Sequence, residues 1–170
     1  MLTDAYLRKH DYLRVSITDK CNLRCRYCMP PDGVDLLPHE QVLRNEEFTR
    51  LIGIFVSMGV TKVRLTGGEP LVRKGFIDIV SQMRSLFPGL ELCLTTNGVL
   101  LGDYIDDLRR LSLKKLNISL DTLSRERYRE ITMRDSLGDV IAAIDRALDS
   151  GFFDVKINAV LFRETIPELD

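Results

Sequence analysis

Apolar and polar residues alternate with a period of two in five short segments of the chain. These segments, which we predict to be β-strands, cover residues 13–18, 62–66, 90–96, 116–121 and 154–161. In the first segment, apolar residues occupy positions 13, 15 and 17, and polar residues occupy positions 14, 16 and 18. Such alternation is typical of strands that bury one face and leave the other face polar.

Between these strands, apolar residues recur with the spacing of amphipathic helices. The predicted helices cover residues 46–58, 75–87, 103–111, 125–131 and 137–150. Asn45 and Ser124 are suitable N-caps for the first and fourth helices, and Gly151 is suited to end the fifth. Because strands and helices alternate along the chain, we expect parallel strands that are joined by helical crossovers.

Parallel strands that are covered on both faces usually consist of nearly continuous apolar residues. The five predicted strands instead keep one polar face, so the helices must cover only the apolar face. We therefore predict an α/β fold, an incomplete (partial) parallel βα barrel with about five strands, helices on the outside and a polar concave face. An antiparallel sheet with one solvated face is the alternative, which the helical segments between the strands disfavour. In parallel barrels the chemistry lies at the carboxyl ends of the strands.

The composition limits the class of protein without indicating its chemistry. A chain of 170 residues with 45% hydrophobic residues is sufficient for one domain with a sizeable core. The 24 basic and 25 acidic residues give a net charge of −1, so global charge indicates neither a nucleic-acid partner nor an anionic membrane. The chain lacks an apolar stretch of about 18 residues and a signal-peptide core, so we expect a cytoplasmic protein with reduced thiols and no membrane span.

Three of the four cysteines, Cys21, Cys25 and Cys28, lie close together directly after the first predicted strand. Soft thiolates select zinc, copper(I) or iron–sulfur clusters. Three ligands argue against a closed structural zinc site, which takes four. A cubane iron–sulfur cluster normally takes four cysteines, so a cluster held by three keeps one iron open for another ligand. We expect the fourth cysteine, Cys93, to be a small core residue.

The cysteine spacing resembles the signature of the radical S-adenosylmethionine (SAM) enzymes. Gly67-Gly68-Glu69-Pro70, directly after the second predicted strand, resembles the second signature of that family. The resemblance implies that Cys21, Cys25 and Cys28 hold a [4Fe-4S] cluster whose open iron binds SAM. An external electron donor would reduce the cluster, and cleavage of SAM would give a 5′-deoxyadenosyl radical that abstracts a substrate hydrogen. The positions that match SAM contacts of the family are Tyr27, Gly68, Glu69 and Ser119.

Longer stretches around these motifs are similar to the GTP 3′,8-cyclase family (molybdenum-cofactor biosynthesis protein A), which starts molybdopterin synthesis. They read LRVSITDKCNLRCRYCMP from Leu13, VRLTGGEPLVR from Val63, TTNG from Thr95 and NISLD from Asn117. This similarity implies that GTP is the substrate and that it is bound by Arg14, Arg64, Thr95 and Lys156. The three basic residues fall on the predicted polar face, where arginine makes paired contacts with phosphate oxygens and lysine adds a point charge.

Two features of the sequence depart from that family. Met133 stands where relatives usually have glycine before Arg134 and Asp135, so we expect a change in the geometry of this loop. The sequence ends at Asp170, so we expect residues 1–170 to form the N-terminal part of a radical SAM core domain without the C-terminal segment that holds a second cluster. We expect this part alone not to complete the cyclisation. The resemblance also implies a homodimer, which is common among full-length members.

Two other functions are compatible with the sequence. One is a different radical SAM enzyme, such as a maturase that acts on a peptide. The other is a non-enzymatic electron-transfer or metal-binding module with one cluster, which would be reduced reversibly without releasing 5′-deoxyadenosine.

Overall fold

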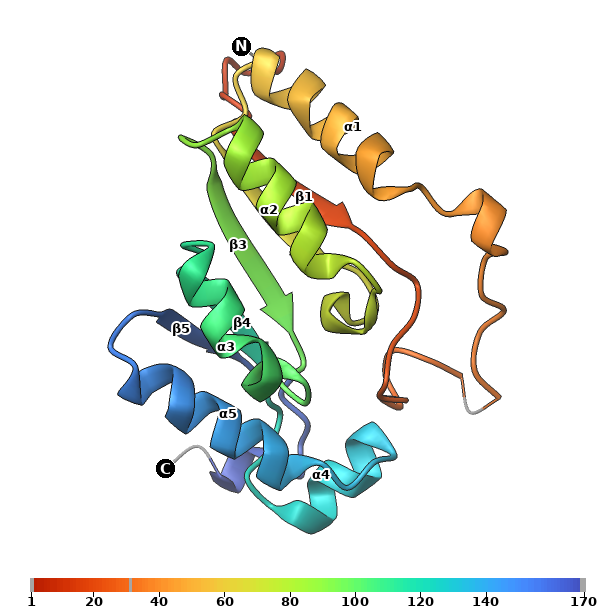
Figure 1. Ribbon diagram of the computed structural model, residues 1–170. Helices are drawn as coiled ribbons and strands as arrows, with labels where there is room; N and C mark the ends of the chain where they lie inside the picture. The colour runs from red at the N-terminus through yellow and green to blue at the C-terminus, as the bar shows by residue number, and fades with distance from the viewer. Residues whose placement is uncertain (1, 31, 169–170) are drawn as a thin grey trace.

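Five parallel strands in chain order form the sheet in the part of the chain that the computed structural model describes, residues 2–30 and 32–168 (Figure 1). The strands are β1 (Tyr12–Ser16), β2 (Lys62–Thr66), β3 (Glu91–Thr96), β4 (Lys115–Ser119) and β5 (Asp154–Asn158). Each strand pairs in parallel with its neighbour along the chain. The predicted βα arrangement is therefore confirmed, and the antiparallel alternative is wrong.

The helices connect the strands and lie mainly on one side of the sheet (Figure 1). They are α1 (Asn45–Ser57), α2 (Phe76–Leu86), α3 (Leu101–Arg110), α4 (Arg125–Thr132) and α5 (Leu137–Asp149), with short 3-10 turns η1 (His39–Gln41), η2 (Pro70–Val72) and η3 (Ile166–Glu168). Helix α1 packs against α2, and α3 packs against α5. The short helix α4 lies beyond the carboxyl end of β4, so it borders the end of the sheet where the motifs gather.

The hydrophobic core lies between these helices and the apolar face of the sheet. Leu65, Leu94 and Leu116 project from β2, β3 and β4 and are fully buried in one cluster with Phe76 of α2. Burial of each such side chain contributes about 1.5–3 kcal/mol to folding. Coverage is thinner over the edge strand β5, where Ile157 is 43% exposed. The apolar residues of the alternating pattern therefore lie in the core, and the polar residues between them lie on the concave face.

Two of the three predicted capping residues lie at the helix ends where they are expected. Ser124 caps α4 by accepting an N–H from the first turn at 3.4 Å, and Gly151 follows α5 with a φ of +60°. The prediction that Asn45 caps α1 is wrong by one residue. Arg44 is the N-cap, because the carboxylate of Glu47 accepts its N–H at 2.7 Å and fixes the start of the helix.

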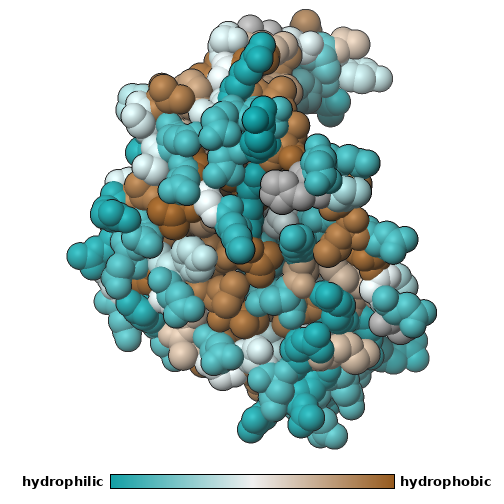
Figure 2. Space-filling view, turned by 45° about the vertical axis from the view of Figure 1, so that its right-hand side comes forward, coloured by the Kyte–Doolittle hydropathy of each residue, from teal (hydrophilic) through white to brown (hydrophobic). Residues whose placement is uncertain are grey.

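The surface is mainly hydrophilic. Figure 2 shows polar side chains across one face of the molecule, with separate apolar patches between them. Exposed apolar residues include Val34, Leu36 and Leu37, in the segment that follows the three cysteines. Among the described residues, no helix combines the length and the hydrophobicity needed to cross a membrane.

Candidate active site

The loops that carry the sequence motifs meet at the carboxyl ends of the strands, as the sequence predicts. β1 leads into the segment with the three cysteines, β2 leads into Gly67–Pro70, and β3 leads into Asn97. Backbone pairing between the first two loops continues beyond the strands, since the N–H of Gly68 donates to the carbonyl of Thr18 at 2.8 Å. The cysteine segment is therefore attached to the loop after β2.

Two glycines allow the cysteine segment to lie against this loop. Gly67 has a φ of +147°, and a Cβ there would lie 2.4 Å from the carbonyl oxygen of Thr18. A Cβ on Gly68 would lie 2.3 Å from the carbonyl oxygen of Lys20. Any side chain at these positions would push the two loops apart. Gly68, a predicted SAM contact, therefore also determines how closely the cysteine segment approaches.

The carboxylate of Glu69 joins the ends of β2 and β3. One oxygen accepts the N–H of Leu71 at 3.0 Å and the hydroxyl of Thr96 at 2.8 Å, and the other accepts the N–H of Asn97 at 2.6 Å. Burial raises the pKa of Glu69, whereas the three donors favour its charged form. The residue is fully buried, so its carboxylate fixes the two loops and is not accessible to a ligand in this structure.

The three clustered cysteines are free thiols. Cys21 and Cys25 are partly buried and Cys28 is exposed. Burial and the nearby negative charges of Cys21, Asp121 and Cys28 raise the pKa of Cys25 to about 11. Thiolates around one tetrahedral zinc ion lie ~3.8 Å apart, given a Zn–S distance of ~2.3 Å. Residues 2–30 and 32–168 contain no group of three or more His, Cys, Asp or Glu side chains placed to hold a metal ion. Three thiols in one segment are nevertheless the soft donors that an iron–sulfur cluster takes.

The last turn of α4 supports the cysteine segment. Arg24 and Arg26 flank Cys25, and their backbone N–H groups donate to the carbonyls of Thr132 and Ile131, both at 2.9 Å. These carbonyls belong to the end of a helix, where the last turn leaves carbonyl groups free to accept bonds from elsewhere. The position of Cys25 therefore depends on how α4 ends.

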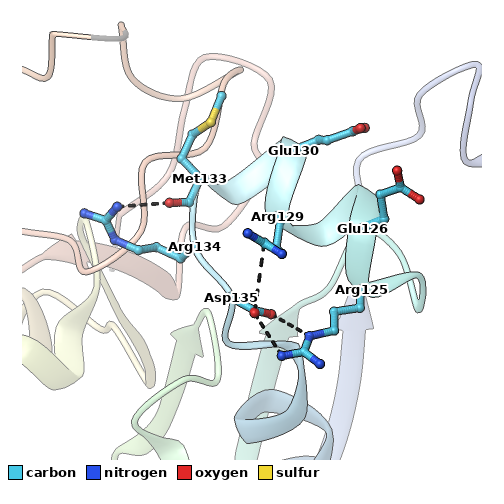
Figure 3. A pocket seen from close by; sticks show the side chains of 7 residues that line it. All are labelled: Arg125, Glu126, Arg129, Glu130, Met133, Arg134 and Asp135. Atoms are coloured by element: carbon cyan, nitrogen blue, oxygen red, sulfur yellow. Dashed lines mark hydrogen bonds and ion pairs between the residues drawn. The ribbon is translucent and has the colours of Figure 1, made fainter.

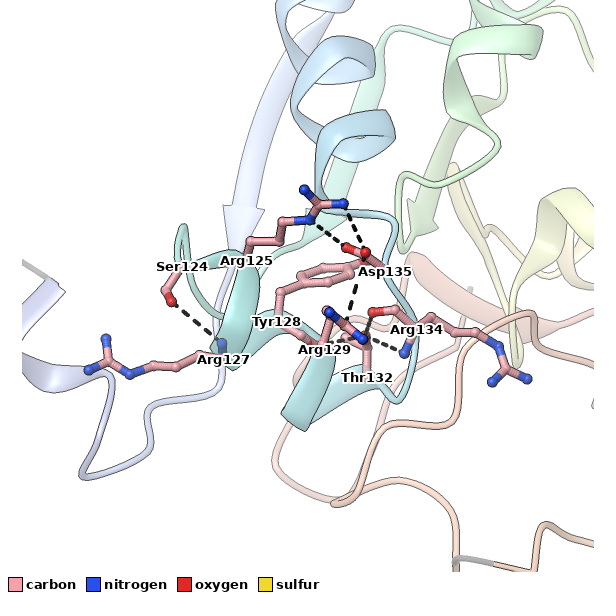
Figure 4. Close-up of polar contacts among 8 residues, drawn as sticks. All are labelled: Ser124, Arg125, Arg127, Tyr128, Arg129, Thr132, Arg134 and Asp135. Atoms are coloured by element: carbon pink, nitrogen blue, oxygen red, sulfur yellow. Dashed lines mark hydrogen bonds and ion pairs between the residues drawn. The ribbon is translucent and has the colours of Figure 1, made fainter.

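Met133 ends α4 in the left-handed conformation, with a φ of +57°. A residue with a side chain is strained in this conformation by roughly 1 kcal/mol, and glycine is not. The Thr132 hydroxyl stabilises the turn, because it donates to the carbonyl of Tyr128 at 2.7 Å and accepts the N–H of Arg134 at 3.3 Å (Figure 4). Met133 thus adopts a backbone conformation that is easier for glycine, the residue that relatives usually have at this position.

An open pocket of about 1060 Å³ lies beside α4, but its charges are balanced (Figure 3). Arg125 makes two hydrogen bonds to Asp135, both at 2.9 Å, and Arg129 lies 4.0 Å from the same carboxylate. The lining residues are Arg125, Glu126, Arg129, Glu130, Met133, Arg134 and Asp135. The three arginines face three acidic residues, so this pocket has no excess positive charge with which to bind a nucleotide.

Tyr27 connects the cysteine segment to the ends of β4 and β5. Its hydroxyl donates to Oδ2 of Asp121 at 2.9 Å, and its ring centroid lies 5.6 Å from that of Phe162. Oδ1 of the same aspartate accepts the N–H of Val160 at 2.8 Å. Ser119 is the last residue of β4 and is partly buried. Tyr27 and Ser119, both predicted SAM contacts, therefore lie at the same end of the sheet as the cysteines.

The predicted GTP contacts lie on the polar, concave face in two neighbouring rows. Arg14 on β1 is in register with Arg64 on β2. Thr95 on β3 and Lys156 on β5 are both in register with Asn117 on β4, two residues further toward the carboxyl ends. Adjacent strands lie about 4.8 Å apart and two residues along a strand span about 6.6 Å, so Arg64 and Thr95 on neighbouring strands are within reach of one ligand. Arg14 and Lys156 lie on the first and fifth strands of the sheet.

Arg64 is held in place by the protein, whereas the other two basic residues face solvent. The guanidinium group of Arg64 donates to the hydroxyl of Tyr12 at 2.8 Å and to the carbonyl of Leu94 at 3.0 Å, and the residue is only 8% exposed. Arg14 and Lys156 are exposed. The concave face therefore combines one fixed cation with two adaptable ones.

A cluster of ion-paired side chains lies closer to the amino ends of the strands than these rows. Glu91 bridges Lys62 at 2.8 Å and Lys115 at 3.0 Å, and these contacts lower its pKa to about 2. Cys93 is buried, as expected, but it lies outside the apolar cluster, on the polar face in register with Arg64 and Lys115. Asp154 on β5 is in register with Lys115, so two lysines and two carboxylates lie at the amino end of this face.

The sequence model of the Radical SAM superfamily matches residues 15–170. The chain belongs to the radical SAM superfamily. The family implies a [4Fe-4S] cluster and SAM, and the three free thiols at the carboxyl ends of the strands are suitable ligands for such a cluster.

Curated relatives of this radical SAM chain include cyclases from distant organisms. The chain is 48% identical to the GTP 3′,8-cyclase of Moorella thermoacetica over 95% of the chain and 50% of that enzyme. It is 47% identical to the mitochondrial GTP 3′,8-cyclase of Arabidopsis thaliana, over 96% of the chain and 42% of that enzyme. It is 51% identical to molybdenum cofactor biosynthesis protein 1 of Drosophila melanogaster, over 96% of the chain and 29% of that protein. The chain therefore spans half or less of the length of these relatives, to which it is homologous.

Solved radical SAM structures share the fold. SuiB of Streptococcus suis bound to S-adenosylmethionine gives a TM-score of 0.73 at 21% identity, over 94% of this chain and 35% of that one. The enzyme anSMEcpe with bound AdoMet gives a TM-score of 0.73 at 18% identity, over 94% of this chain and 44% of that one. At this level of identity the likeness concerns the fold alone, and it confirms a partial radical SAM barrel.

Two residues of this radical SAM site were not among the predicted site residues. Asn97 lies between Glu69 and the cysteine segment, and Asp121 holds Tyr27. Both residues follow the carboxyl end of a strand, and this position is the one feature of the sequence that could have marked them as site residues. Their contacts come from segments far away along the chain, which no local pattern indicates.

Proposed function

We propose that this chain is the SAM-cleaving part of a GTP 3′,8-cyclase in molybdenum cofactor biosynthesis. The observation that carries the proposal is the 47–48% identity to GTP 3′,8-cyclases over 94–96% of the chain. The free thiols beside the glycine loop and the basic concave face support it, because the proposed reaction needs both a cluster and an anion site.

Cys21, Cys25 and Cys28 are the proposed ligands of the cluster. When bound, the [4Fe-4S] cluster supplies the electron that cleaves SAM to a 5′-deoxyadenosyl radical. Backbone hydrogen bonds join the segment that carries these thiols to the loop after β2, at Thr18 and Lys20, and to the end of α4, at Arg24 and Arg26, which supports this assignment. In a cluster held by these three thiols, one iron would have no protein ligand from this set and would be available to SAM.

SAM would be placed by groups on both sides of the cysteine segment. Gly68 offers backbone groups that no side chain shields, and Tyr27 and Ser119 lie beside the end of β4. Glu69 would contribute indirectly, because the whole residue is buried, its carboxylate accepts three hydrogen bonds and its N–H donates to the carbonyl of Lys20. The buried carboxylate instead keeps the glycine loop in position.

GTP would bind on the concave face, with its phosphates at Arg14, Arg64 and Lys156 and a hydrogen bond to Thr95. A triphosphate carries several negative charges, so it requires more than one cation, and charge-assisted bonds are the strongest available here. The fixed guanidinium of Arg64 loses little freedom when it meets a phosphate, since Tyr12 and Leu94 already orient it. A neutral ligand would gain less from these cations than a triphosphate does.

The remaining parts of the proposal concern partners and location. Electrons would come from an external donor, and the domain assignment is the N-terminal part of a radical SAM core domain over residues 1–170. A homodimer is proposed for the full-length form, and no nucleic acid or membrane partner is proposed. The proposed compartment is the cytoplasm, although one relative is a mitochondrial enzyme.

The cluster is tested by anaerobic reconstitution of the chain with iron and sulfide. About four irons per chain are expected, and Cys25→Ala should abolish their uptake, whereas Cys93→Ala should retain it. Addition of SAM and a chemical reductant should release 5′-deoxyadenosine. Stoichiometric zinc in place of iron would contradict the cluster, and reversible reduction without 5′-deoxyadenosine would favour the electron-transfer module.

The substrate is tested by thermal unfolding of the reconstituted chain in the presence of GTP. GTP should raise the melting temperature, because a ligand that binds only the folded state stabilises it. Arg64→Ala should weaken this protection, and Arg109→Ala, on the exposed side of α3, should not. Protection by a peptide and none by GTP would favour a peptide maturase.

A further inference from the structure

We propose that Asn97 is a positioning residue that donates an N–H···S hydrogen bond to Cys21 and thereby raises the reduction potential of the cluster. Nδ2 of Asn97 lies 3.8 Å from Sγ of Cys21, within hydrogen-bonding range for sulfur. The inference rests on the proposed function, because it takes Cys21 to be a ligand of the cluster. Nothing in the sequence motifs assigns this role to Asn97.

The orientation of the Asn97 side chain is fixed by its other contacts. Oδ1 accepts the N–H of Val99 at 3.1 Å, and Nδ2 donates to Oδ1 of Asn22 at 2.7 Å. If the amide were rotated by 180°, its oxygen would face the oxygen of Asn22, and its NH₂ group would face an N–H. Both contacts would then be repulsive, so the NH₂ group must face the cysteine segment.

The backbone of Asn97 is fixed as firmly as its side chain. Its N–H donates to the buried carboxylate of Glu69 at 2.6 Å. The hydroxyl of Thr96 donates to the other oxygen of that carboxylate at 2.8 Å and accepts the N–H of Gly98 at 3.1 Å. Glu69, in the second signature of the family, is therefore bonded to the backbone of Asn97, and the side chain of Asn97 is bonded to Cys21, the proposed cluster ligand.

Cys21 has two N–H donors directed at its sulfur. The first is the backbone N–H of Leu23, at 3.4 Å, and the second is the side-chain amide of Asn97. Hydrogen bonds to ligand sulfurs stabilise negative charge, and reduction adds one negative charge to the cluster. Loss of a donor should therefore make the cluster harder to reduce. Only proline would remove the backbone donor, and it would also constrain the backbone of the cysteine segment, whereas the Asn97 donor is removed by a side-chain substitution alone.

The test is an EPR-monitored redox titration of the reconstituted 170-residue chain and its variants. Asn97→Ala should lower the midpoint potential by about 59 mV, which corresponds to a tenfold change in a one-electron equilibrium. Asn97→Asp should lower it at least as much, because it keeps the acceptor for Val99, loses the donor and adds negative charge. The matched control is Asn22→Ala, which removes the other acceptor of Asn97. The N–H of Val99 still fixes the amide orientation in this variant and the bond to Cys21 remains, so its potential should stay close to that of the wild type.

The outcomes separate this inference from the proposed function. Equal potentials in the wild type, Asn97→Ala and Asn97→Asp would overturn the inference while the cluster and SAM cleavage remain. A wild-type chain that takes up no iron would overturn the proposed function and the inference together.

A measurement on the unmodified chain covers the case in which the Asn97 variants do not fold. Pulsed EPR of the reduced cluster, with asparagine side chains labelled with ¹⁵N, should detect a nitrogen coupled to the cluster. The coupling should persist in Asn22→Ala. Its absence from the wild-type spectrum would overturn the inference.

Discussion

Gly68 lies where the loop after β2 meets the cysteine segment, and a Cβ there would lie 2.3 Å from the carbonyl oxygen of Lys20. Gly68→Ala should therefore separate the two loops and destabilise the apo-protein by roughly 1–3 kcal/mol, as other overpacking changes do. It should also reduce iron uptake, because the cysteine segment loses its support. Chemical denaturation and iron analysis measure the two effects.

The control for this substitution is Gly138→Ala in α5. No atom lies within 4 Å of a Cβ built at that position, so alanine should stabilise the helix by about 0.5–1 kcal/mol. A Gly68→Ala variant with wild-type stability and full iron uptake would contradict the role assigned to the close contact.

The residues that sequence analysis predicted are those whose placement follows a local rule. Arg14 and Arg64 were assigned to the polar face from the period of two along their strands, and the register confirms this placement. The burial of the Glu69 carboxylate could not be foreseen, because Thr96 lies 27 residues away in the sequence. The contact between Asn97 and Asn22 spans 75 residues and depends on both loops being formed.

Strands β2, β3 and β4 are joined at their amino ends by Glu91, which bridges Lys62 and Lys115. These contacts lower the pKa of Glu91 to about 2, from an ordinary value of 4.5. Below pH 4.5 the unfolded chain therefore binds a proton more readily at this residue than the folded chain does. The stability that Glu91 contributes should be fully present above pH 4.5 and lost as the pH falls toward 2.

Denaturation at pH 6 and pH 3 measures this contribution. It should be modest, ~1 kcal/mol or less, because the carboxylate is partly exposed and surface ion pairs are screened. Glu91→Gln should be less stable than the wild type at pH 6 and should lose less stability between the two pH values. An equal loss in both proteins would contradict the assignment.

Strand and helix positions were predicted well from periodicity, but their ends were not. The fifth strand was predicted to extend to residue 161, yet β5 ends at Asn158. Beyond that point the N–H of Val160 bonds to the side chain of Asp121 instead of the backbone of β4. Similarly, α1 begins one residue earlier than predicted, because Glu47 accepts the N–H of Arg44. Side-chain bonds of this kind determine where elements stop, and periodicity does not register them.

The molecule as a whole covers one face of its sheet with helices, while Arg14 and Lys156 on the other face remain exposed. A radical formed at the carboxyl ends would therefore be accessible to solvent. With SAM, GTP and a reductant, the reconstituted chain should release 5′-deoxyadenosine in large excess over any cyclised nucleotide. Chromatography of the products gives this ratio, and a ratio near one would show that the described part shields the radical by itself.

Lys156 lies on β5, whose outer edge has no strand partner among the described residues. An edge strand offers unpaired backbone groups to any strand that can reach it, from a longer chain or from another molecule. Such a neighbour would restrain the backbone that carries Lys156 and so change how this lysine reaches a phosphate. The affinity for GTP should therefore differ between a sheet in which β5 has a partner strand on its outer edge and one in which it has none. A titration with GTP would detect this difference.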